Sequence, residues 1–387
     1  MKSLDCIVVV GTRPEAIKMA PVVLALLKSR RQFRTRLLLT GQHRQMVDQV
    51  LAAFQLRPDM DLDLMERSQS LARLAAKALE GLSTVFRRER PDLVLVEGDT
   101  TTVFAASLAA FYQGIRVGHV EAGLRTRDKR NPFPEEMNRR FAGALADLHF
   151  APTLEARENL LREQVDGSRI FVTGNPVIDA LRMIRSHATA MARSEFPFLG
   201  NGRRTLLVTA HRRENHGEPI RRICRAVSQL VTQHPEVQII WPVHPNPAVA
   251  DVVRGHLGGC DRIYLTPPLG YSSFVGVMAL STFVITDSGG VQEEAPALGK
   301  PVLVLRETTE RPEGVIAGAV RLIGTHEGDI VEQVSQLLTS EAELREMARV
   351  TCPYGDGRAA ERILAAIRGY FDLPTVPAES SLAPAAA

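Results

Sequence analysis

Three acidic residues in the first half of the chain stand where regular elements begin or end. Asp99 follows a predicted strand over Leu93–Glu97, Glu121 follows a predicted strand over Arg116–Val120, and Glu135 opens a predicted helix. The carboxyl ends of parallel strands meet at one edge of a sheet, so we expect these carboxylates to converge on one cleft. Their repulsion should raise the pKa of at least one of them and supply an acid and a base at neutral pH. Simpler roles stay open, since Asp99 can cap a helix and Glu135 can complement a helix dipole.

A glycine pair in the second half of the chain is typical of an anion site. Ser288, Gly289 and Gly290 follow a predicted strand over Phe283–Thr286 and lead into a helix. Glycines let a backbone approach an anion closely, and a helix N-terminus offers free N–H groups to it. Glu294 comes one turn later, where an acid can accept hydrogen bonds from a ribose diol. The alternative is a glycine turn without a ligand.

A basic turn follows the first predicted strand. Arg13 precedes Pro14, which is well placed to open a helix, and Lys18 lies one helical turn further on. A cation beside a helix N-terminus suits a phosphate. The turn is neither a GxGxxG nor a Walker A loop, because the glycines are missing. A plain tight turn with a solvated arginine is the competing interpretation.

Two further polar loops follow strands of the second half. His211 precedes Arg212 and Arg213 after one strand, a combination that suits a diphosphate and a proton. Arg311 lies in a polar loop after another strand and could face a substrate. A solvated basic loop and a surface turn are the respective alternatives.

The elements that must position these residues alternate along the chain as strand and helix, which predicts parallel sheets covered by helices. In the first half we predict strands over Cys6–Val10, Arg36–Thr40, Leu93–Glu97, Arg116–Val120 and Ile170–Thr173, and helices over Ala16–Lys28, Ser70–Arg88, Thr102–Phe111 and Glu135–Ala146. In the second half we predict strands over Leu206–Thr209, Gln238–Trp241, Arg262–Leu265, Phe283–Thr286 and Val302–Leu305, and helices over Ile220–Thr232, Tyr271–Ala279, Gln292–Leu298 and Ile330–Leu338.

Two Rossmann-like domains facing a central cleft are therefore expected, over residues 1–176 and 177–357. We place their junction near Asn175–Arg185, and a polar stretch begins at His187. A last helix is predicted over Arg358–Tyr370 and could belong to either domain. The tail over 374–387 is small and Pro-rich with few apolar anchors, so we expect it to be disordered.

Composition excludes several classes of protein. The 387 residues contain 47 Lys+Arg against 44 Asp+Glu, a balance that does not favour binding to nucleic acid or to an anionic membrane. No apolar run is long enough to span a membrane, and the N-terminus lacks the features of a signal peptide. The four cysteines are far apart, which argues against a disulfide framework or a cysteine zinc site. We expect a cytoplasmic protein without a metal site.

Long motifs occur in one order along nearly the whole chain. They are GTRPEAIKMAPV, TGQHRQM, GDTTT, GHVEAGLRT, PFPEEMNR, GNPVID, HRREN, PVHPNP, DSGGVQEEAP and GKPVLVLRETTERPE. On these motifs the chain resembles the non-hydrolysing UDP-N-acetylglucosamine 2-epimerases. The resemblance implies a GT-B-like fold, with the C-terminal helix (358–371) packed back on the N-terminal domain, and a homodimer. It also implies interconversion of UDP-GlcNAc and UDP-ManNAc without NAD or another cofactor, by elimination of UDP to 2-acetamidoglucal and re-addition.

The resemblance assigns roles to individual residues. The implied catalytic set is Asp99, Glu121, Glu135 and His211. The implied substrate-binding set is Arg13 and Lys18 with Ser288, Gly289 and Gly290 at the phosphates, Glu294 at the ribose, Phe274 beside the uracil, and Arg311 near sugar or phosphate. This chemistry agrees with the residue types, because a C2 proton is not acidic and its loss must be coupled to departure of a stabilised UDP anion.

Members of this family also bind a second UDP-GlcNAc as an activator. The residues that match this site are Gln42, Gln45, Gln69, Glu136, Arg212 and His244. Ser68 stands where the resemblance leads us to expect arginine, which would weaken or remove activation. Glu97 stands where histidine is often expected, and another acid beside Asp99 could shift the pKa of Asp99.

Other functions remain open from the sequence. A hydrolysing 2-epimerase, which releases ManNAc and UDP, shares this fold, and relatives act on other 2-acetamido UDP-sugars. A glycosyltransferase would share the phosphate and ribose motif but needs only one base, so it leaves the three N-terminal carboxylates unexplained. A non-catalytic nucleotide-sugar sensor could lose the acids, whereas all of them are present here.

Overall fold

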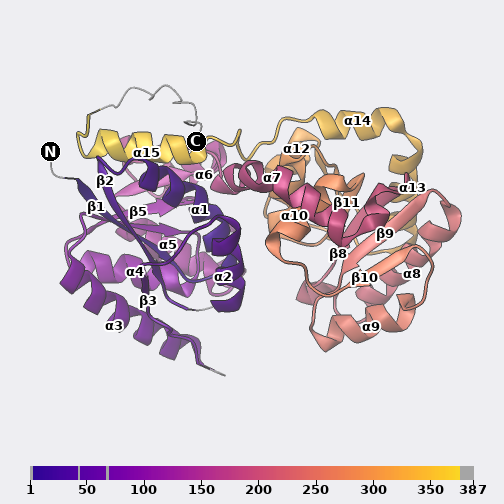
Figure 1. Cartoon of the computed structure of the whole chain (residues 1–387), viewed down its shortest axis with the longest axis horizontal. Coiled ribbons are helices and arrows are strands. Elements are labelled where there is room, and N and C mark those ends of the chain that lie inside the picture. The colour runs from indigo at the N-terminus through magenta and orange to yellow at the C-terminus, as the bar shows by residue number, and fades with distance from the viewer. Residues whose placement is uncertain (1–2, 42–43, 67–68, 375–387) are drawn as a thin grey trace, which may run out of the picture.

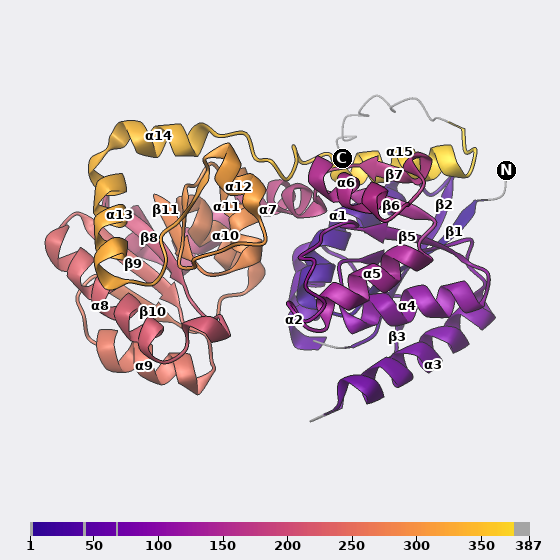
Figure 2. The same cartoon turned by 180° about the vertical axis from the view of Figure 1, so that it is seen from behind.

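The fold consists of two parallel β-sheets, each covered by helices, in two lobes that lie side by side (Figures 1 and 2). The computed structural model describes residues 3–41, 44–66 and 69–374. The chain is therefore an α/β protein with two Rossmann-like domains, as predicted. Within the described ranges, none of the helices is both long and apolar enough to cross a membrane.

The first sheet has seven parallel strands in the order β3-β2-β1-β4-β5-β6-β7. Its central strands are buried runs of Val, Ile and Leu, which is typical of a parallel sheet covered on both faces. Strand order reverses between β1 and β4, and a crevice opens at such a point beyond the strand ends. The strands are β1 (Leu4–Val10), β2 (Phe33–Leu39), β3 (Met60–Asp61), β4 (Leu93–Glu97), β5 (Arg116–Val120), β6 (Leu148–Ala151) and β7 (Ile170–Val172).

The second sheet has six parallel strands in the order β10-β9-β8-β11-β12-β13. Here the strand order reverses between β8 and β11, so the loops after these two strands border a second crevice. The strands are β8 (Arg204–Thr209), β9 (Val237–Pro242), β10 (Ile263–Thr266), β11 (Phe283–Thr286), β12 (Val302–Val304) and β13 (Val320–Leu322).

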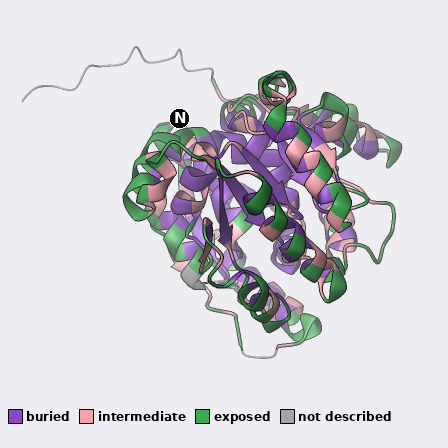
Figure 3. Ribbon diagram, turned by 90° about the vertical axis from the view of Figure 1, so that its right-hand side faces the viewer, coloured by how far each residue is buried: buried purple, intermediate pink, exposed green. Residues whose placement is uncertain are grey.

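Helices connect successive strands and turn their apolar faces to the sheets, so buried residues lie in the interior and exposed ones on the outside (Figure 3). The first lobe has α1 (Arg13–Lys28), α2 (Arg44–Ala53), α3 (Leu71–Glu89), α4 (Thr101–Tyr112), α5 (Glu135–Leu145) and α6 (Leu154–Arg162). The second has α8 (Glu218–Gln233), α9 (Pro247–Leu257), α10 (Tyr271–Leu280), α11 (Gly289–Ala297), α12 (Pro312–Ala317), α13 (Glu327–Thr339) and α14 (Glu341–Arg349).

A long helix, α7 (Pro176–Glu195), links the two lobes. This helix was not among the predicted ones, and the polar stretch that begins at His187 starts inside it, two turns before its end. Ala188 and Ala192, four residues apart, are buried against α10. Close approach of the two helices depends on Gly276, where an added Cβ would lie 2.0 Å from the carbonyl oxygen of Ala188.

The last helix, α15 (Ala359–Tyr370), returns to the first lobe and packs on α1 and α7 (Figure 1). Its position is fixed by Asp179 of α7, whose carboxylate accepts hydrogen bonds from the backbone N–H groups of Ala359 and Ala360 at 3.1 and 2.9 Å. This arrangement agrees with the fold that the resemblance implied. Residues 375–387 of the predicted disordered tail lie outside the described residues.

Candidate active site

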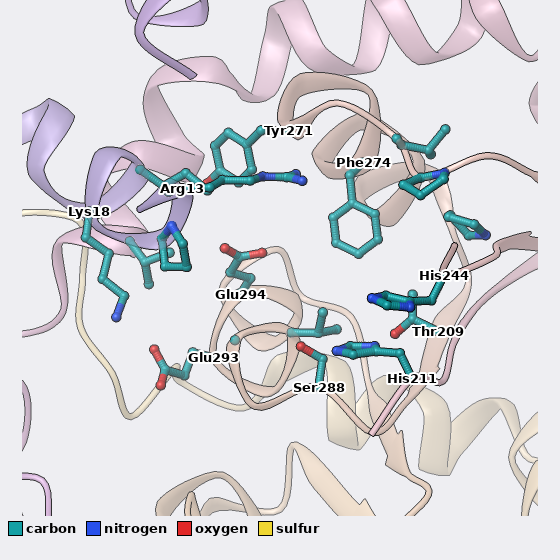
Figure 4. A pocket seen from close by; sticks show the side chains of 18 of the residues that line it. Arg13, Lys18, Thr209, His211, His244, Tyr271, Phe274, Ser288, Glu293 and Glu294 are labelled. Carbon is teal, nitrogen blue, oxygen red and sulfur yellow. The ribbon is translucent and has the colours of Figure 1, made fainter. Parts of the chain in front are cut away.

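A cavity of about 450 Å³ lies between the two lobes and is lined by both of them. This volume is within the roughly 300–1,000 Å³ of small-molecule sites. Lys18 and Glu293 lie at one end of the cavity and His211 and His244 at the other, with Glu294 between them (Figure 4). The predicted site residues on its wall are Arg13, Lys18, His211, His244, Phe274, Ser288, Gly290, Glu294 and Arg311.

Buried charges from both lobes form one connected group at the first end. The Lys18 ammonium lies 2.9 Å from Glu97 and 2.6 Å from Glu121. Asn175, which caps the linking helix α7, donates to Glu121 at 2.9 Å and to Glu293 at 2.8 Å. On the side of the second lobe, the Arg311 guanidinium donates to Glu293 at 2.8 Å. We call this group the buried charge cluster: Lys18, Glu97, Glu121, Asn175, Glu293 and Arg311.

The pKa values of Glu97 and Glu121, the two acids that the first lobe contributes to the cluster, are shifted in opposite directions. Burial raises the pKa of the Glu97 carboxyl well above its usual value, and the charge of Glu121 adds to this effect. Burial also acts on Glu121, but Lys18 and a hydrogen bond from Glu97 outweigh it and lower the pKa of Glu121 to about 2. The sequence predicted a raised pKa within the set of Asp99, Glu121 and Glu135. For Glu121 the direction is the opposite, because Lys18 was not expected beside it.

The backbone of Glu121 is strained. Its φ is 61°, in the left-handed region that residues with a Cβ rarely adopt, at a cost of about 1–3 kcal/mol. The side chain is held in this conformation by Lys18 and Asn175. Such strain is concentrated at sites where a side chain must be aimed, which favours a functional role for this carboxylate.

Glu15 ties together the two loops at the switch point of the first sheet, and sequence reasoning missed it. Its buried carboxylate accepts hydrogen bonds from the Gly11 N–H at 2.6 Å and the Thr12 hydroxyl at 3.0 Å. It also accepts one from the Thr100 hydroxyl at 2.7 Å, across from the loop after β4. The turn that carries Arg13 is therefore fixed against the loop that carries Asp99.

At the other end of the cavity, Asp287 supports His211. Asp287 is fully buried, and its Oδ2 accepts hydrogen bonds from the backbone N–H groups of His211 and Arg212, both at 2.8 Å, and from Asn215. Its Oδ1 lies 3.4 Å from Nδ1 of His211. His211 stacks on His244 with 5.5 Å between ring centroids. Burial lowers the pKa of His211 and the Asp287 charge opposes this, which is an arrangement suited to a histidine that transfers a proton.

The helix α11 begins at the wall of the cavity. Ser288 is its N-cap residue, and a Cβ added to Gly290 would meet no atom within 4 Å, so open space lies above this turn. The first N–H groups of a helix are free to bind an anion. One turn later, burial and repulsion from Glu293 raise the pKa of Glu294 to about 8, against the effect of Arg13.

Comparison with known proteins identifies the family of the chain. Residues 25–368 match the family model described as UDP-N-acetylglucosamine 2-epimerase. The chain belongs to this family. It is 52% identical, over 94% of its length and 95% of the relative's, to a UDP-N-acetylglucosamine 2-epimerase of Bacillus subtilis (strain 168).

Solved structures of the 2-epimerase family share the whole fold. A UDP-GlcNAc 2-epimerase from Neisseria meningitidis, bound to UDP-GlcNAc, superposes with a TM-score of 0.89 at 44% identity and covers 95% of this chain and 100% of its own. A Methanocaldococcus jannaschii UDP-GlcNAc 2-epimerase in complex with UDP-GlcNAc and UDP has a TM-score of 0.80 at 32% identity, with the same coverage.

None of the three predicted catalytic acids of this 2-epimerase family member, Asp99, Glu121 and Glu135, is among the residues that line the cavity. Glu121 contacts Lys18, which does line it. Asp99 forms an ion pair with Arg139 of α5, and its backbone oxygen accepts a hydrogen bond from Asn138 at 3.0 Å. Glu135 is partly exposed at the start of the same helix. Asp99 follows β4 at the same sheet edge as Glu121, which follows β5, and Glu135 is the first residue of α5. Gly289 is buried beneath the cavity wall, where an added Cβ would lie 3.1 Å from Arg311.

Four of the residues that match a second nucleotide-sugar site have side chains that the structure describes: Gln69, Glu136, Arg212 and His244. Glu136 is fully buried and accepts hydrogen bonds from the backbone N–H groups of Thr126 and Arg127, so it holds that loop. His244 lies in the same cavity as His211, and Arg212 lies 3.5 Å from Glu310. Gln69 accepts a hydrogen bond from the N–H of Glu66 at 3.3 Å. Gln42, Ser68 and the side chain of Gln45 lie outside the described residues.

Proposed function

We propose that the chain is a UDP-GlcNAc 2-epimerase that interconverts UDP-GlcNAc and UDP-ManNAc by eliminating UDP to 2-acetamidoglucal and adding it back. One observation carries the proposal: one cavity is lined both by Lys18, Glu293 and Arg311 of the buried charge cluster and by the N-terminus of α11, which suits a diphosphate. The similarity to relatives named UDP-N-acetylglucosamine 2-epimerase and to a structure bound to UDP-GlcNAc supports it.

The elimination needs a base and a stabilised leaving group at the same time. A base takes the proton from C2, the electrons of that bond form the C1–C2 double bond, and the C1–O bond breaks with its electrons left on UDP. Arg13 and the N-terminus of α11, with Ser288 and Gly290, would stabilise the charge on the departing diphosphate. Addition of a proton to the other face of C2 and return of UDP to C1 give the epimer.

Each residue of the site has a proposed role that follows from its position. Phe274 would flank the uracil, Glu294 would hold the ribose, and Arg311 would lie near sugar or phosphate. Glu121 is ionised at neutral pH, as a base must be. Lys18, which we expected at a phosphate, would also fix the orientation of Glu121. The proposed catalytic set is Asp99, Glu121, Glu135 and His211.

Proton NMR of the purified protein with UDP-GlcNAc in D₂O tests the proposal. We expect UDP-ManNAc to appear with deuterium at C2, because the abstracted proton exchanges with solvent before it returns. Free ManNAc and UDP would contradict re-addition and indicate a hydrolysing enzyme. No reaction would contradict the substrate assignment, and the same assay with other 2-acetamido UDP-sugars would then separate a different specificity from a binding protein.

Activation by a second UDP-GlcNAc and a homodimer belong to the same proposal, since the family resemblance implies both. Gln45→Ala should change the dependence of the rate on UDP-GlcNAc concentration more than the maximal rate. An unchanged curve would argue against a working second site in a chain that carries Ser68. Light scattering of the protein, with and without UDP-GlcNAc, tests the homodimer.

A further inference from the structure

Glu97 and Glu121 are two buried carboxyl groups that contact one lysine, Lys18, at the end of the first sheet. Glu97 is the last residue of β4 and lies opposite Val120, the residue before Glu121, in the parallel ladder. Both side chains are buried against the same ammonium group, with Lys18 Nζ 2.9 Å from Glu97 and 2.6 Å from Glu121. Two ionised carboxylates on one ammonium would leave a buried negative charge without a partner, which one proton on the pair removes.

The charges around the pair balance when it holds that one proton. Lys18 from α1 faces both carboxyls, at 2.9 and 2.6 Å. Across Asn175 of α7, Glu293 of α11 is paired with Arg311. One Lys18 charge then matches one charge on the carboxyl pair, and Arg311 matches Glu293.

His119 beside the pair and Glu310 beside Arg311 do not change this charge balance. His119 of β5 donates from Nε2 to the Gly98 carbonyl at 2.7 Å, and burial lowers its pKa to about 4, so it is neutral. Glu310, the other partner of Arg311, has Arg306 as a second countercharge. Loss of the shared proton would leave one buried negative charge without a partner, which is costly.

We propose that Glu97 is a positioning residue that shares one proton with Glu121 and thereby keeps Glu121 ionised and aimed as the base. This inference deepens the proposed function and rests on it for its kinetic consequence. The burial of Glu97 and its raised pKa support it. Histidine, which the family resemblance leads us to expect at this position, could also donate a hydrogen bond to Glu121 without adding a negative charge.

The proton can be observed without any reaction. Infrared difference spectra of the free protein separate protonated carboxyls from carboxylates, and we expect Glu97→Gln to lose one protonated-carboxyl component at neutral pH. Glu294→Gln calibrates the loss of one such group, because the pKa of Glu294 is about 8. Glu163→Gln is the negative control, since Glu163 pairs with Arg125 and its pKa is lowered. No lost component in Glu97→Gln would overturn the inference.

The pH profile of kcat/KM gives the second readout. In the wild type, kcat/KM should fall about tenfold per pH unit once Glu97 loses its proton, because Glu121 then loses its donor. Glu97→Gln keeps a donor at every pH, so its alkaline decline should start at least about one unit higher. Glu97→His should restore activity that Glu97→Ala loses. Identical alkaline limbs in wild type and Glu97→Gln would overturn the inference.

The two readouts separate the two claims. If the wild type does not epimerise UDP-GlcNAc, the proposed function fails while the infrared result still decides whether Glu97 holds the proton. If the enzyme is active but Glu97→Gln leaves the infrared band and the pH profile unchanged, only the shared proton is refuted.

Discussion

The two ends of the cavity are built by different means. At the first end, charged side chains are buried against one another, and Glu121 is held with a φ of 61°. At the second end, backbone N–H groups at the start of α11 and a histidine supported by Asp287 face open space. Buried charges cost stability unless they are paired, so a cluster of several buried charges is most simply explained by a role in catalysis. A helix N-terminus, by contrast, is suited to binding an anion.

Substitutions at the first end should lower the rate of the chemical step without changing UDP binding. Glu121→Gln removes the base and should lower kcat by about 10²- to 10⁴-fold. UDP affinity should change little, because the second lobe supplies most of the nucleotide site. The rate is measured by NMR and the affinity by calorimetry with UDP. Turnover at the wild-type rate would remove Glu121 from the mechanism.

A matched variant shows whether the effect is specific. Glu163→Gln makes the same chemical change at a partly exposed acid that pairs with Arg125. It should keep both the rate and the affinity of the wild type. A loss as large as that of Glu121→Gln would mean that the assay reports general damage.

The second end should contribute to the rate through the orientation of His211. Asp287→Asn keeps an oxygen for the backbone N–H groups but removes the charge beside Nδ1, so kcat should fall by about 10²-fold. Thermal unfolding, measured in parallel, checks that the loop has stayed folded. If the variant is folded and its kcat is unchanged, His211 has a role in binding and not in catalysis.

Binding should be affected at the start of α11 without a change in the chemistry. Gly290→Val places a side chain in the open space above the helix, and UDP affinity should fall by about tenfold, which is about 1.4 kcal/mol. Gly255→Val in α9 is the matched control, since it is also a helical glycine with free space around an added Cβ. Equal UDP affinity in both variants would move the diphosphate away from α11.

A separate effect, on stability and not on the rate or on binding, is expected as a function of pH. The pKa of Glu294 is about 8 in the folded protein and near 4.5 when exposed, so the folded state binds the extra proton. Stability from this group is therefore full below about pH 4.5 and is lost as the pH rises towards 8. Melting temperatures from pH 5 to 9 should fall less for Glu294→Gln than for wild type. Glu332→Gln, at an exposed site on α13, should follow the wild type.

Some elements could be predicted to the residue. The predicted strands Leu93–Glu97, Arg116–Val120 and Phe283–Thr286 coincide with β4, β5 and β11. Their apolar, β-branched residues are bounded by polar or glycine residues, so both period and ends are visible. The linking helix α7 was not predicted, because polar residues outnumber the two buried alanines, Ala188 and Ala192, in its second half.

The sequence by itself determined the family, the α/β class and the loops that would border the cleft, because motifs and strand periodicity are local properties of the chain. Only the tertiary structure decided which of these residues meet. Glu97 and Lys18 are 79 residues apart, and Asn175 joins two acids that are 172 residues apart (121 to 293). The protonation of Glu97 and Glu121 depends on burial and on the charges next to them. Those neighbours are set by the packing of two lobes around α7, which no local pattern encodes.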